Sequence, residues 1–180
     1  MKRKKNKKVY IGLSIDILHH GHINLINKAQ KFGDLIIGLY TDKAIVQKKR
    51  LPLISYENRK KILKNISGVK KIIPQNEWEY CNNLLKVRPD FMVHGDDWKL
   101  NDQNLRLKTI KTLKKINAKL IEIPFTKNIS SSALSARMFS QNMLPSNRMS
   151  SLKRMIESGK FCRIIETHSP LSALIAENTF

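Results

Sequence analysis

The fold is decided by residues 9–32, which read VYIGLSIDILHHGHINLINKAQKF. Residues 9–13 are apolar and predict a buried strand, and the apolar residues at positions 23, 26 and 29 have the spacing of one helix face. A polar turn, residues 14–21, lies between them, and Gly33 and Asp34 mark the end of the helix. A strand that leads through a turn into a helix predicts the first unit of an alternating α/β fold.

The alternation of strands and helices continues along the next hundred or so residues. Further apolar strands are predicted at residues 35–40, 69–73, 91–93 and 120–123, and helices at residues 55–66, 78–87, 105–116 and 130–140. This order predicts a Rossmann-like α/β fold, with a parallel five-stranded sheet and helices on both faces. Ligands bind at the carboxyl ends of the strands in such sheets, so functional motifs should directly follow strands.

The composition is that of a globular protein with a strong positive charge. The chain has 180 residues, 41% of them hydrophobic, and a formal net charge of +20. Ser14, Asp16 and His19 interrupt the apolar stretch that a signal peptide would need after the basic N-terminus, and no apolar run of about 18 residues could cross a membrane. Cys81 and Cys162 allow at most one disulfide and no metal cluster. We expect a soluble, cytoplasmic protein.

The positive charge favours either a nucleic-acid surface or a small polyanionic substrate. Apart from the run at positions 2–8, the lysines are scattered along predicted helices, which is typical of solvated helix faces. We therefore expect neither nucleic acid nor a membrane as a partner, and a small anionic substrate agrees with the charge.

The chain divides into four predicted segments. Residues 1–8 form a basic flexible arm, residues 9–140 the α/β domain, and residues 141–148 (QNMLPSNR) a polar linker. Residues 149–180 hold two predicted helices, 149–158 and 171–178, around a predicted strand, 161–166. These elements are too few to bury a core of their own, so they predict the start of a second domain. The alternative is a C-terminal extension that packs on the first domain.

The strongest local motif is the sequence HHGH, residues 19–22, between the first strand and the first helix. A helix N-terminus offers free N–H groups and the positive end of the helix dipole to phosphate. Gly21 allows the backbone to approach a ligand closely, and His19 and His22 can donate hydrogen bonds as charge develops on phosphate oxygens. A zinc site is disfavoured because no third ligand with suitable spacing lies nearby. The motif therefore predicts phosphate chemistry.

Three further motifs also follow predicted strands. Residues 95–98 (GDDW) could bind Mg²⁺ or ribose hydroxyls, or form an ordinary turn. Residues 130–132 (SSS) could bind phosphate at a helix N-terminus, or cap that helix. Residues 48–50 (KKR) could bind an anion, or be solvated. Because all of these motifs fall at the same edge of the predicted sheet, we expect a nucleotide site there.

These motifs in this order resemble the cytidylyltransferase family of the HxGH nucleotidyltransferase superfamily, and the glycerol-3-phosphate cytidylyltransferases in particular. The resemblance covers about residues 8–138 and rests on the segments 13–22 (LSIDILHHGH), 40–42 (YTD), 55–60 (SYENRK), 95–98 (GDDW) and 125–132 (FTKNISSS). It implies the HUP/HIGH nucleotidyltransferase fold and transfer of CMP from CTP with release of pyrophosphate. It also implies Mg²⁺ that enters with CTP, and a homodimer.

The resemblance assigns roles to individual residues. It implies catalytic roles for His19, His22 and Lys48. It implies nucleotide contacts for Ser14, Ile15, Gly21, Arg50, Gly95, Asp96, Asp97, Trp98, Ile129, Ser130, Ser131 and Ser132. It implies acceptor contacts for Lys48, Arg59 and Trp78, and no metal ligand from the protein.

Several residues depart from the glycerol-phosphate pattern. Leu13-Ser14 stands where the family has Gly-Thr, Phe125 where it has arginine, and Cys81 where it has a substrate-binding lysine. His94 replaces a methionine before GDDW, which favours a phosphonate branch of the family. These differences disfavour glycerol 3-phosphate as the acceptor.

The tail carries a second resemblance. Residues 151–173 are similar to the opening of phosphoenolpyruvate mutases, which occur fused to cytidylyltransferases in phosphonate biosynthesis. This resemblance implies 2-hydroxyethylphosphonate as the acceptor. Other phospho-alcohols including glycerol 3-phosphate, an adenylyltransferase of the same fold, and a non-catalytic RNA- or anion-binding module are the alternatives that the sequence leaves open.

Overall fold

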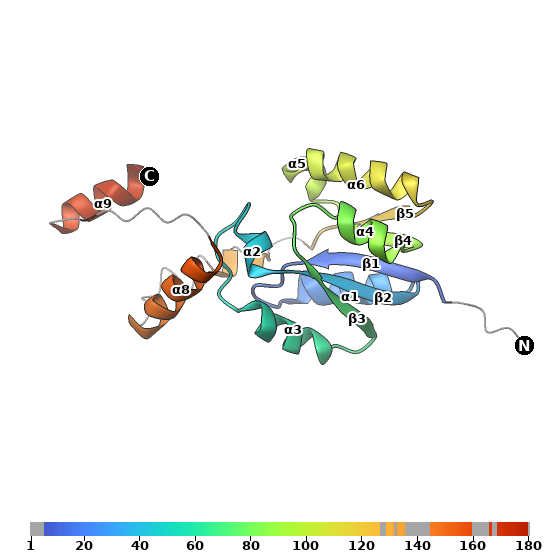
Figure 1. Ribbon diagram of the computed structural model, residues 1–180, viewed down its shortest axis with the longest axis horizontal. Coiled ribbons are helices and arrows are strands. Elements are labelled where there is room, and N and C mark those ends of the chain that lie inside the picture. The colour runs from blue at the N-terminus through green and yellow to red at the C-terminus, as the bar shows by residue number, and fades with distance from the viewer. Residues whose placement is uncertain are drawn as a thin grey trace, which may run out of the picture.

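A five-stranded parallel sheet forms the centre of the protein (Figure 1), as a computed structural model shows for residues 6–126, 129–131, 133–135, 145–159, 166 and 169–179. The strand order is β3-β2-β1-β4-β5, and each neighbouring pair is parallel. The strands are β1 (Lys8–Leu13), β2 (Asp34–Tyr40), β3 (Val69–Gln75), β4 (Phe91–Gly95) and β5 (Lys119–Ile123). The predicted Rossmann-like parallel sheet is confirmed.

Helices cover both faces of this sheet, as predicted (Figure 1). On one face lie α1 (His20–Gln30) and α3 (Tyr56–Lys64), and on the other α4 (Cys81–Val87) and α6 (Gln103–Lys115). Two short helices, α2 (Asp42–Ile45) and α5 (Trp98–Asn101), follow β2 and β4, while α8 (Pro145–Glu157) and α9 (Pro170–Thr179) belong to the tail. Within the described ranges, none of these helices combines the length and the apolar character that crossing a bilayer requires.

The two faces of the sheet differ in chemistry. One face, which we call the aliphatic face, is built from buried Val9, Ile11, Leu13, Leu35, Ile37 and Leu39, with Ile26 and Ala29 of α1 and Leu63 of α3 packed on them. The alternation of these residues along β1 and β2 follows from the two-residue period of a strand. The aliphatic face is thus a dry layer of branched side chains between the sheet and two helices.

The opposite face, which we call the aromatic face, contains buried Tyr10, Tyr40, Tyr80, Met92 and Trp98, with Leu84, Leu105 and Leu113 of the covering helices. Its hydroxyls find partners, because Tyr10 Oη donates to Gln75 Oε1 at 2.6 Å and Tyr40 Oη to the Trp78 carbonyl at 2.9 Å. Gly12 is required here, since a Cβ on it would overlap the ring of Tyr80. The aromatic face therefore extends toward the carboxyl ends of the strands.

Several element boundaries differ from the prediction. Helix α1 begins at His20 instead of Ile23, which places the HHGH motif in its first turn. Strand β3 continues through Pro74 to Gln75 because β3 is an edge strand, where a missing N–H is tolerated. Helix α4 begins at Cys81, three residues after the predicted start at Trp78.

In the tail, α8 begins at Pro145, inside the predicted linker, and proline is favoured in a first helical turn. Residues 1–5 of the predicted arm, residues 136–144, and residues 161–165 of the predicted last strand lie outside the described residues. The division of the chain into domains stays a prediction.

Candidate active site

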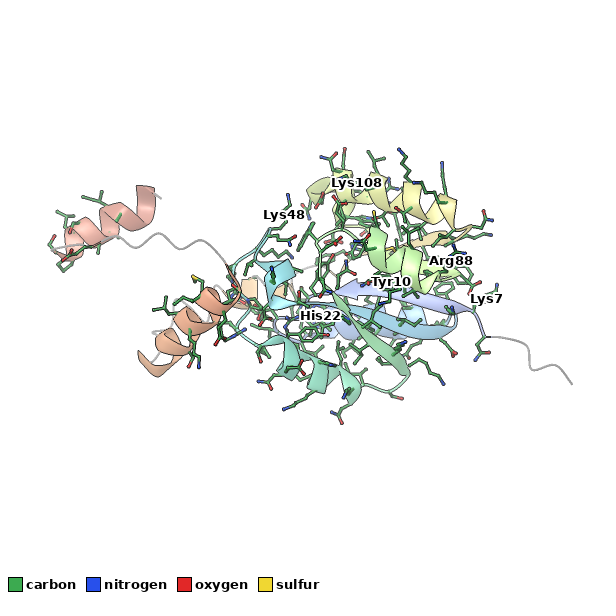
Figure 2. All side chains as sticks on the ribbon, in the orientation of Figure 1. Lys7, Tyr10, His22, Lys48, Arg88 and Lys108 are labelled. Carbon is green, nitrogen blue, oxygen red and sulfur yellow. The ribbon has the colours of Figure 1, made fainter. Side chains whose placement is uncertain are left out.

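A cleft of about 670 Å³ opens at the carboxyl ends of the strands. Figure 2 shows His22 and Lys48 at this end of the sheet, while Lys7 and Arg88 lie at the opposite end. Eleven of the predicted site residues line the cleft: Ser14, His19, Gly21, His22, Lys48, Trp78, Gly95, Asp97, Trp98, Ser130 and Ser131. The structure thus brings together residues from the segments that follow β1, β2, β3, β4 and β5.

Five other predicted site residues do not line the cleft, namely Ile15, Arg50, Arg59, Asp96 and Ile129. Ser132 lies outside the described residues. The side chain of Ile15 is fully buried and belongs to the aliphatic face, which explains why it cannot reach a nucleotide directly.

The imidazole rings of His19 and His22 lie together at the first turn of α1. Their centroids are 3.9 Å apart, and the backbone N–H of His19 donates to Nδ1 of His22 at 3.4 Å. Because Nδ1 of His22 accepts this bond, its proton lies on Nε2. A Cβ on Gly21 would lie 3.0 Å from the His19 ring and 3.4 Å from Thr126 Cβ, so glycine leaves the room that this pair of rings needs.

Both histidines are neutral in the free protein. Burial lowers the pKa of His22 to about 3, with smaller contributions from the charges of His19 and Lys49. Burial, followed by the charge of His20, also lowers the pKa of His19. Each ring is therefore neutral near pH 7 and has one N–H to donate.

The Nδ1 atom of His19 is buried and has no hydrogen-bond partner among the described residues. The His19 ring nevertheless lines the cleft, beside the N-terminus of an eleven-residue helix whose first N–H groups have no partner within the helix. Phosphate is the ligand that a helix N-terminus and imidazole N–H groups suit.

Lys28, Lys48 and Lys49 bring positive charge to the cleft wall, and two of them, Lys48 and Lys49, are consecutive in the loop after β2. Both side chains are exposed and line the cleft, and Lys49 Nζ lies 5.5 Å from the centroid of the Trp78 ring. Arg50 points elsewhere, since its Nη2 binds Asp16 Oδ2 at 2.6 Å. The residue run 48–50 was visible in the sequence, but only the backbone path decides which of three consecutive side chains face the cleft. Lys49 is therefore a site residue that sequence reasoning missed.

Arg59 is fully buried rather than exposed to an acceptor. Its Nε donates to the Ile54 carbonyl at 3.0 Å, its Nη1 to the Ser14 carbonyl, and its Nη2 binds Asp42 Oδ1 at 2.7 Å. These bonds tie the loop after β1 to the loop before α3. The structure gives Arg59 a positioning role behind the cleft in place of the predicted contact with the acceptor.

Some residues of the GDDW motif stabilise the fold, and others line the cleft. Asp96 Oδ1 accepts from the Phe125 N–H at 2.8 Å, and Trp98 Nε1 donates to Glu122 Oε1 at 2.8 Å. The hydrogen bond from Arg106 is the main cause that lowers the pKa of Glu122 to about 2, so this carboxylate stays charged. Asp97 is the carboxylate of the motif that lines the cleft.

An aromatic wall continues the aromatic face into the cleft. The rings of His94 and Trp98 stack with centroids 3.7 Å apart and an interplanar angle of 8°. His94 Nδ1 lies 2.7 Å from the Gly95 carbonyl, so Nδ1 carries the proton, and Nε2 accepts from Tyr80 Oη at 3.1 Å. Burial lowers the pKa of His94, which keeps the ring neutral. Trp98 belongs to the GDDW motif and His94 directly precedes it, whereas Tyr80 had no signal in the sequence.

Trp78 completes the aromatic wall from the β3 side. Its ring lies 5.3 Å from that of Tyr40, and its Nε1 donates to Asp102 Oδ2 at 3.0 Å. Cys81, by contrast, is half-buried at the start of α4, where its Sγ accepts from the Thr112 hydroxyl at 3.2 Å. Cys81 does not line the cleft.

The serines after β5 act partly as a cap. Ser130 Oγ accepts from the Ala133 N–H at 3.1 Å, and Ser131 Oγ donates to the Ile17 carbonyl at 3.0 Å. Both residues still line the same cleft as the histidines. Capping and ligand binding are compatible at these positions.

The described residues contain no group of three or more His, Cys, Asp and Glu side chains that could hold a metal ion. Asp97 is one carboxylate at the cleft that could share a Mg²⁺ ion with a triphosphate, and Mg²⁺ keeps several ligands from water and phosphate oxygens in such sites. The residues present thus fit a Mg²⁺ ion that arrives with a nucleotide.

Known proteins resemble this chain in sequence and in fold. It is 42% identical over 95 residues to the glycerol-3-phosphate cytidylyltransferase of Bacillus spizizenii, a match that covers 52% of this chain and 74% of that protein. It is 36% identical over 84 residues to the ethanolamine-phosphate cytidylyltransferase of Mus musculus, covering 46% of this chain and 21% of that protein. The solved structure of a lipopolysaccharide core biosynthesis protein from Thermoplasma volcanium GSS1 superposes with a TM-score of 0.59 at 24% identity, over 68% of this chain and 100% of that one, which shows a shared fold.

The sequence model of one family spans most of the chain. The model described as Cytidylyltransferase-like matches residues 10–137, which include all of the sheet but the first two residues of β1, the HHGH motif and every described residue of the cleft wall. The chain therefore belongs to the cytidylyltransferase-like family and is a nucleotidyltransferase.

Proposed function

We propose that this protein transfers CMP from CTP to a small phosphonate, with 2-hydroxyethylphosphonate as the best candidate, and releases pyrophosphate. The observation that carries the proposal is the pair of neutral imidazoles, His19 and His22, at the N-terminus of α1. Lys48 and Lys49 face the same cleft, so a polyanion finds both hydrogen-bond donors and cations there.

In this reaction a phosphonate oxygen of the acceptor attacks the α-phosphorus of CTP. The bond from that phosphorus to the bridging oxygen breaks, and pyrophosphate leaves with the bonding electron pair. The cleft holds the two reactants in line and places N–H donors where charge develops, which is where most of the acceleration in phosphoryl transfer arises. His19 and His22 donate to the oxygens of the pentavalent phosphorus and of the leaving group.

The remaining cleft residues bind and orient the substrates. Lys48 holds the acceptor anion, and Lys49 takes the contact with the triphosphate that sequence analysis assigned to Arg50. Ser130 and Ser131 bind phosphate together with their backbone N–H groups. Residues 95–98 line the nucleoside side, and Mg²⁺ enters with CTP and neutralises part of the triphosphate charge.

The aromatic wall supports an acceptor with a hydroxyl tail over one with an ammonium tail. Two carboxylates, Asp97 and Asp102, line the cleft and are the groups that an ammonium tail would need. However, Asp102 already accepts from Trp78 Nε1 and the Leu105 N–H, and Lys49 Nζ lies over the Trp78 ring. A second cation at that ring would meet the charge of Lys49, whereas a neutral hydroxyl would not.

The similarity of residues 151–173 to phosphoenolpyruvate mutases supports the phosphonate class, and we propose that the chain is the cytidylyltransferase part of such a fusion. Glycerol 3-phosphate is the second candidate acceptor, because a relative 42% identical is named for it. We also propose a homodimer, which light scattering at assay concentration tests directly.

A screen of pyrophosphate release tests the proposed function. CTP, and ATP in parallel, are combined with 2-hydroxyethylphosphonate, 2-aminoethylphosphonate, glycerol 3-phosphate and phosphocholine, each at saturating nucleotide. We expect CTP to be used, with the highest kcat/KM for 2-hydroxyethylphosphonate. A tenfold preference for glycerol 3-phosphate, equivalent to about 1.4 kcal/mol in transition-state binding, would show that the acceptor is a phospho-alcohol instead.

Release of pyrophosphate with ATP but not with CTP would indicate an adenylyltransferase. Steeply salt-dependent binding of RNA, without pyrophosphate release, would indicate a non-catalytic binding module.

A further inference from the structure

Arg154, on the tail helix α8, reaches back to the sheet domain. Its Nη1 donates to the Leu53 carbonyl at 2.7 Å, and its Nη2 donates to the Pro52 carbonyl at 2.8 Å. The same Nη2 lies 3.4 Å from Asp42 Oδ2. A guanidinium group that binds two successive carbonyls and a carboxylate fixes the path of the backbone that carries those carbonyls.

The backbone that Arg154 binds belongs to residues 50–54, which directly follow Lys48 and Lys49. The inner side of this segment is held by Asp16, whose Oδ1 accepts from the N–H groups of Leu53 at 2.5 Å and Ile54 at 3.2 Å. Asp16 Oδ2 also binds Arg50. The segment is therefore clamped between α8 on the outside and the loop after β1 on the inside.

A second path leads from Arg154 to the cleft. Asp42 is shared, with Oδ2 toward Arg154 and Oδ1 bound to Arg59 at 2.7 Å. Arg59 in turn donates to the carbonyl of Ser14, a residue that lines the cleft.

The next residue after Ser14 has a strained backbone. Ile15 has a φ of 45°, a left-handed conformation that a β-branched residue rarely adopts. Strained turns of this kind persist when the surrounding bonds hold them in place. Arg154, Asp42 and Arg59 are part of that surrounding network on the Ser14 side.

We propose that Arg154 is a positioning residue of the active site: α8 fixes the segment 50–54 and thereby holds Lys48 and Lys49 at the cleft. The inference rests on the proposed function for its kinetic consequence, but the clamp itself is a property of the fold. The match to the family ends at residue 137, and Arg154 lies beyond it. The proposal therefore gives a residue of the tail a role in the nucleotidyltransferase site.

The clamp is tested by hydrogen exchange on the intact chain, independently of catalysis. The N–H groups of Leu53 and Ile54 are the probes, in wild type, Arg154→Met, Arg154→Lys and the control Lys153→Ala, whose side chain is exposed on the same helix. We expect faster exchange at both amides in Arg154→Met, an intermediate rate in Arg154→Lys, which keeps one donor group, and the wild-type rate in Lys153→Ala. Unchanged exchange in Arg154→Met would overturn the proposal, whatever the enzyme's substrate is.

The consequence for the site is tested by kinetics on the same variants. We expect Arg154→Met to raise the KM of the acceptor about tenfold, the equivalent of one or two lost hydrogen bonds, with kcat within about threefold of wild type. Arg154→Lys should recover part of the loss. Equal KM values in wild type and Arg154→Met would overturn the proposal, as would a fall in kcat with no change in KM. A wild-type chain that releases no pyrophosphate would refute the proposed function alone, and the exchange result would still decide the clamp.

Discussion

Each face of the sheet carries a core cluster of buried residues, but the two clusters differ in chemistry. On the aliphatic face, branched side chains of β1 and β2 pack against α1 and α3 without a polar group among the buried core residues. On the aromatic face, Tyr10, Tyr40 and Tyr80 carry hydroxyls that need partners, and these partners continue to the cleft through His94. Apolar packing is tolerant of exchange, whereas each buried hydroxyl must keep a defined geometry.

This difference indicates which face of the sheet can determine substrate specificity. The aliphatic face positions the start of α1, and hence the histidines, by holding the body of that helix against the sheet. The aromatic face supplies the wall that the substrates meet, through Tyr40, Trp78, Tyr80 and Trp98. Changes on the first face should alter stability, and changes on the second should alter substrate binding.

The largest effect is expected from a truncation on the aliphatic face. Leu35 is fully buried, so Leu35→Ala should lower the free energy of unfolding by about 2–5 kcal/mol, as measured by urea denaturation. The matched variant Tyr80→Phe loses the hydroxyl bond to His94. It should lower the free energy of unfolding by only about 1 kcal/mol, and its main effect should be a higher KM for a substrate. If kcat of the folded Leu35→Ala protein falls as steeply as its stability, the proposed separation of roles is wrong.

The histidines come next. His19→Ala and His22→Ala should each lower kcat by about 10²–10³, or roughly 2.7–4 kcal/mol in transition-state stabilisation, while the fold stays intact. The neighbouring His20 is exposed and does not line the cleft, so His20→Ala is the control and should keep kcat within about twofold. Far-ultraviolet circular dichroism checks the fold. An unchanged turnover in either of the first two variants removes that histidine from the mechanism.

The pH dependence of stability should also separate the cleft from the core. The pKa of His22 is about 3 in the folded protein against an ordinary 6.5, so the unfolded chain binds a proton between these values that the folded chain does not. Stability is therefore full above pH 6.5 and falls as the pH drops toward 3. Between pH 7 and pH 5 the loss from His22 should be about 2 kcal/mol.

Chemical denaturation at both pH values measures this loss. In His22→Gln the difference between pH 7 and pH 5 should shrink by about that amount, while Leu35→Ala should keep the wild-type difference at lower absolute stability. Equal differences in wild type and His22→Gln would show that His22 is accessible to protons in the folded state.

The smallest effect concerns the cleft cations. Lys49→Ala should raise the KM of CTP about tenfold, or 1.4 kcal/mol, because Lys49 faces the cleft whereas Arg50 is bound to Asp16. Lys43→Ala removes an exposed lysine from the adjacent helix α2 and should leave KM within about twofold. If Lys43→Ala and Lys49→Ala behave alike, the effect is one of net charge and Lys49 makes no specific contact.

Local sequence patterns were enough for the fold and for much of the cleft. The two-residue period of strands and the helical spacing of apolar residues predict the sheet, and the positions directly after strands point to His19, His22, Gly95 and Ser130. The boundary errors have local causes: an edge strand accepts Pro74, and the first turn of α1 contains polar residues that do not show a helical pattern.

Other site residues could not be found in this way. Tyr40 and Tyr80 look like core aromatics in the sequence, and they become cleft residues only because β2 ends, and α4 begins, at the same rim as His94. Arg59 was named from the sequence as an acceptor contact, but its burial behind the cleft could not be predicted, because its carboxylate partner, Asp42, is brought beside it only by the fold. These assignments depend on pairs that are distant in the chain.

The sequence by itself determined the alternating α/β order, the motif after β1 and the family, because these depend on residue type and on spacing over a few turns of chain. Only the tertiary structure decided which cations face the cleft and which are bound in ion pairs. Arg50 and Lys49 are neighbours in the chain, yet Asp16 holds the first while the second lines the cleft. The direction of a side chain in a loop is set by partners from elsewhere in the fold, here Asp16 in the loop after β1, and no local pattern encodes such partners.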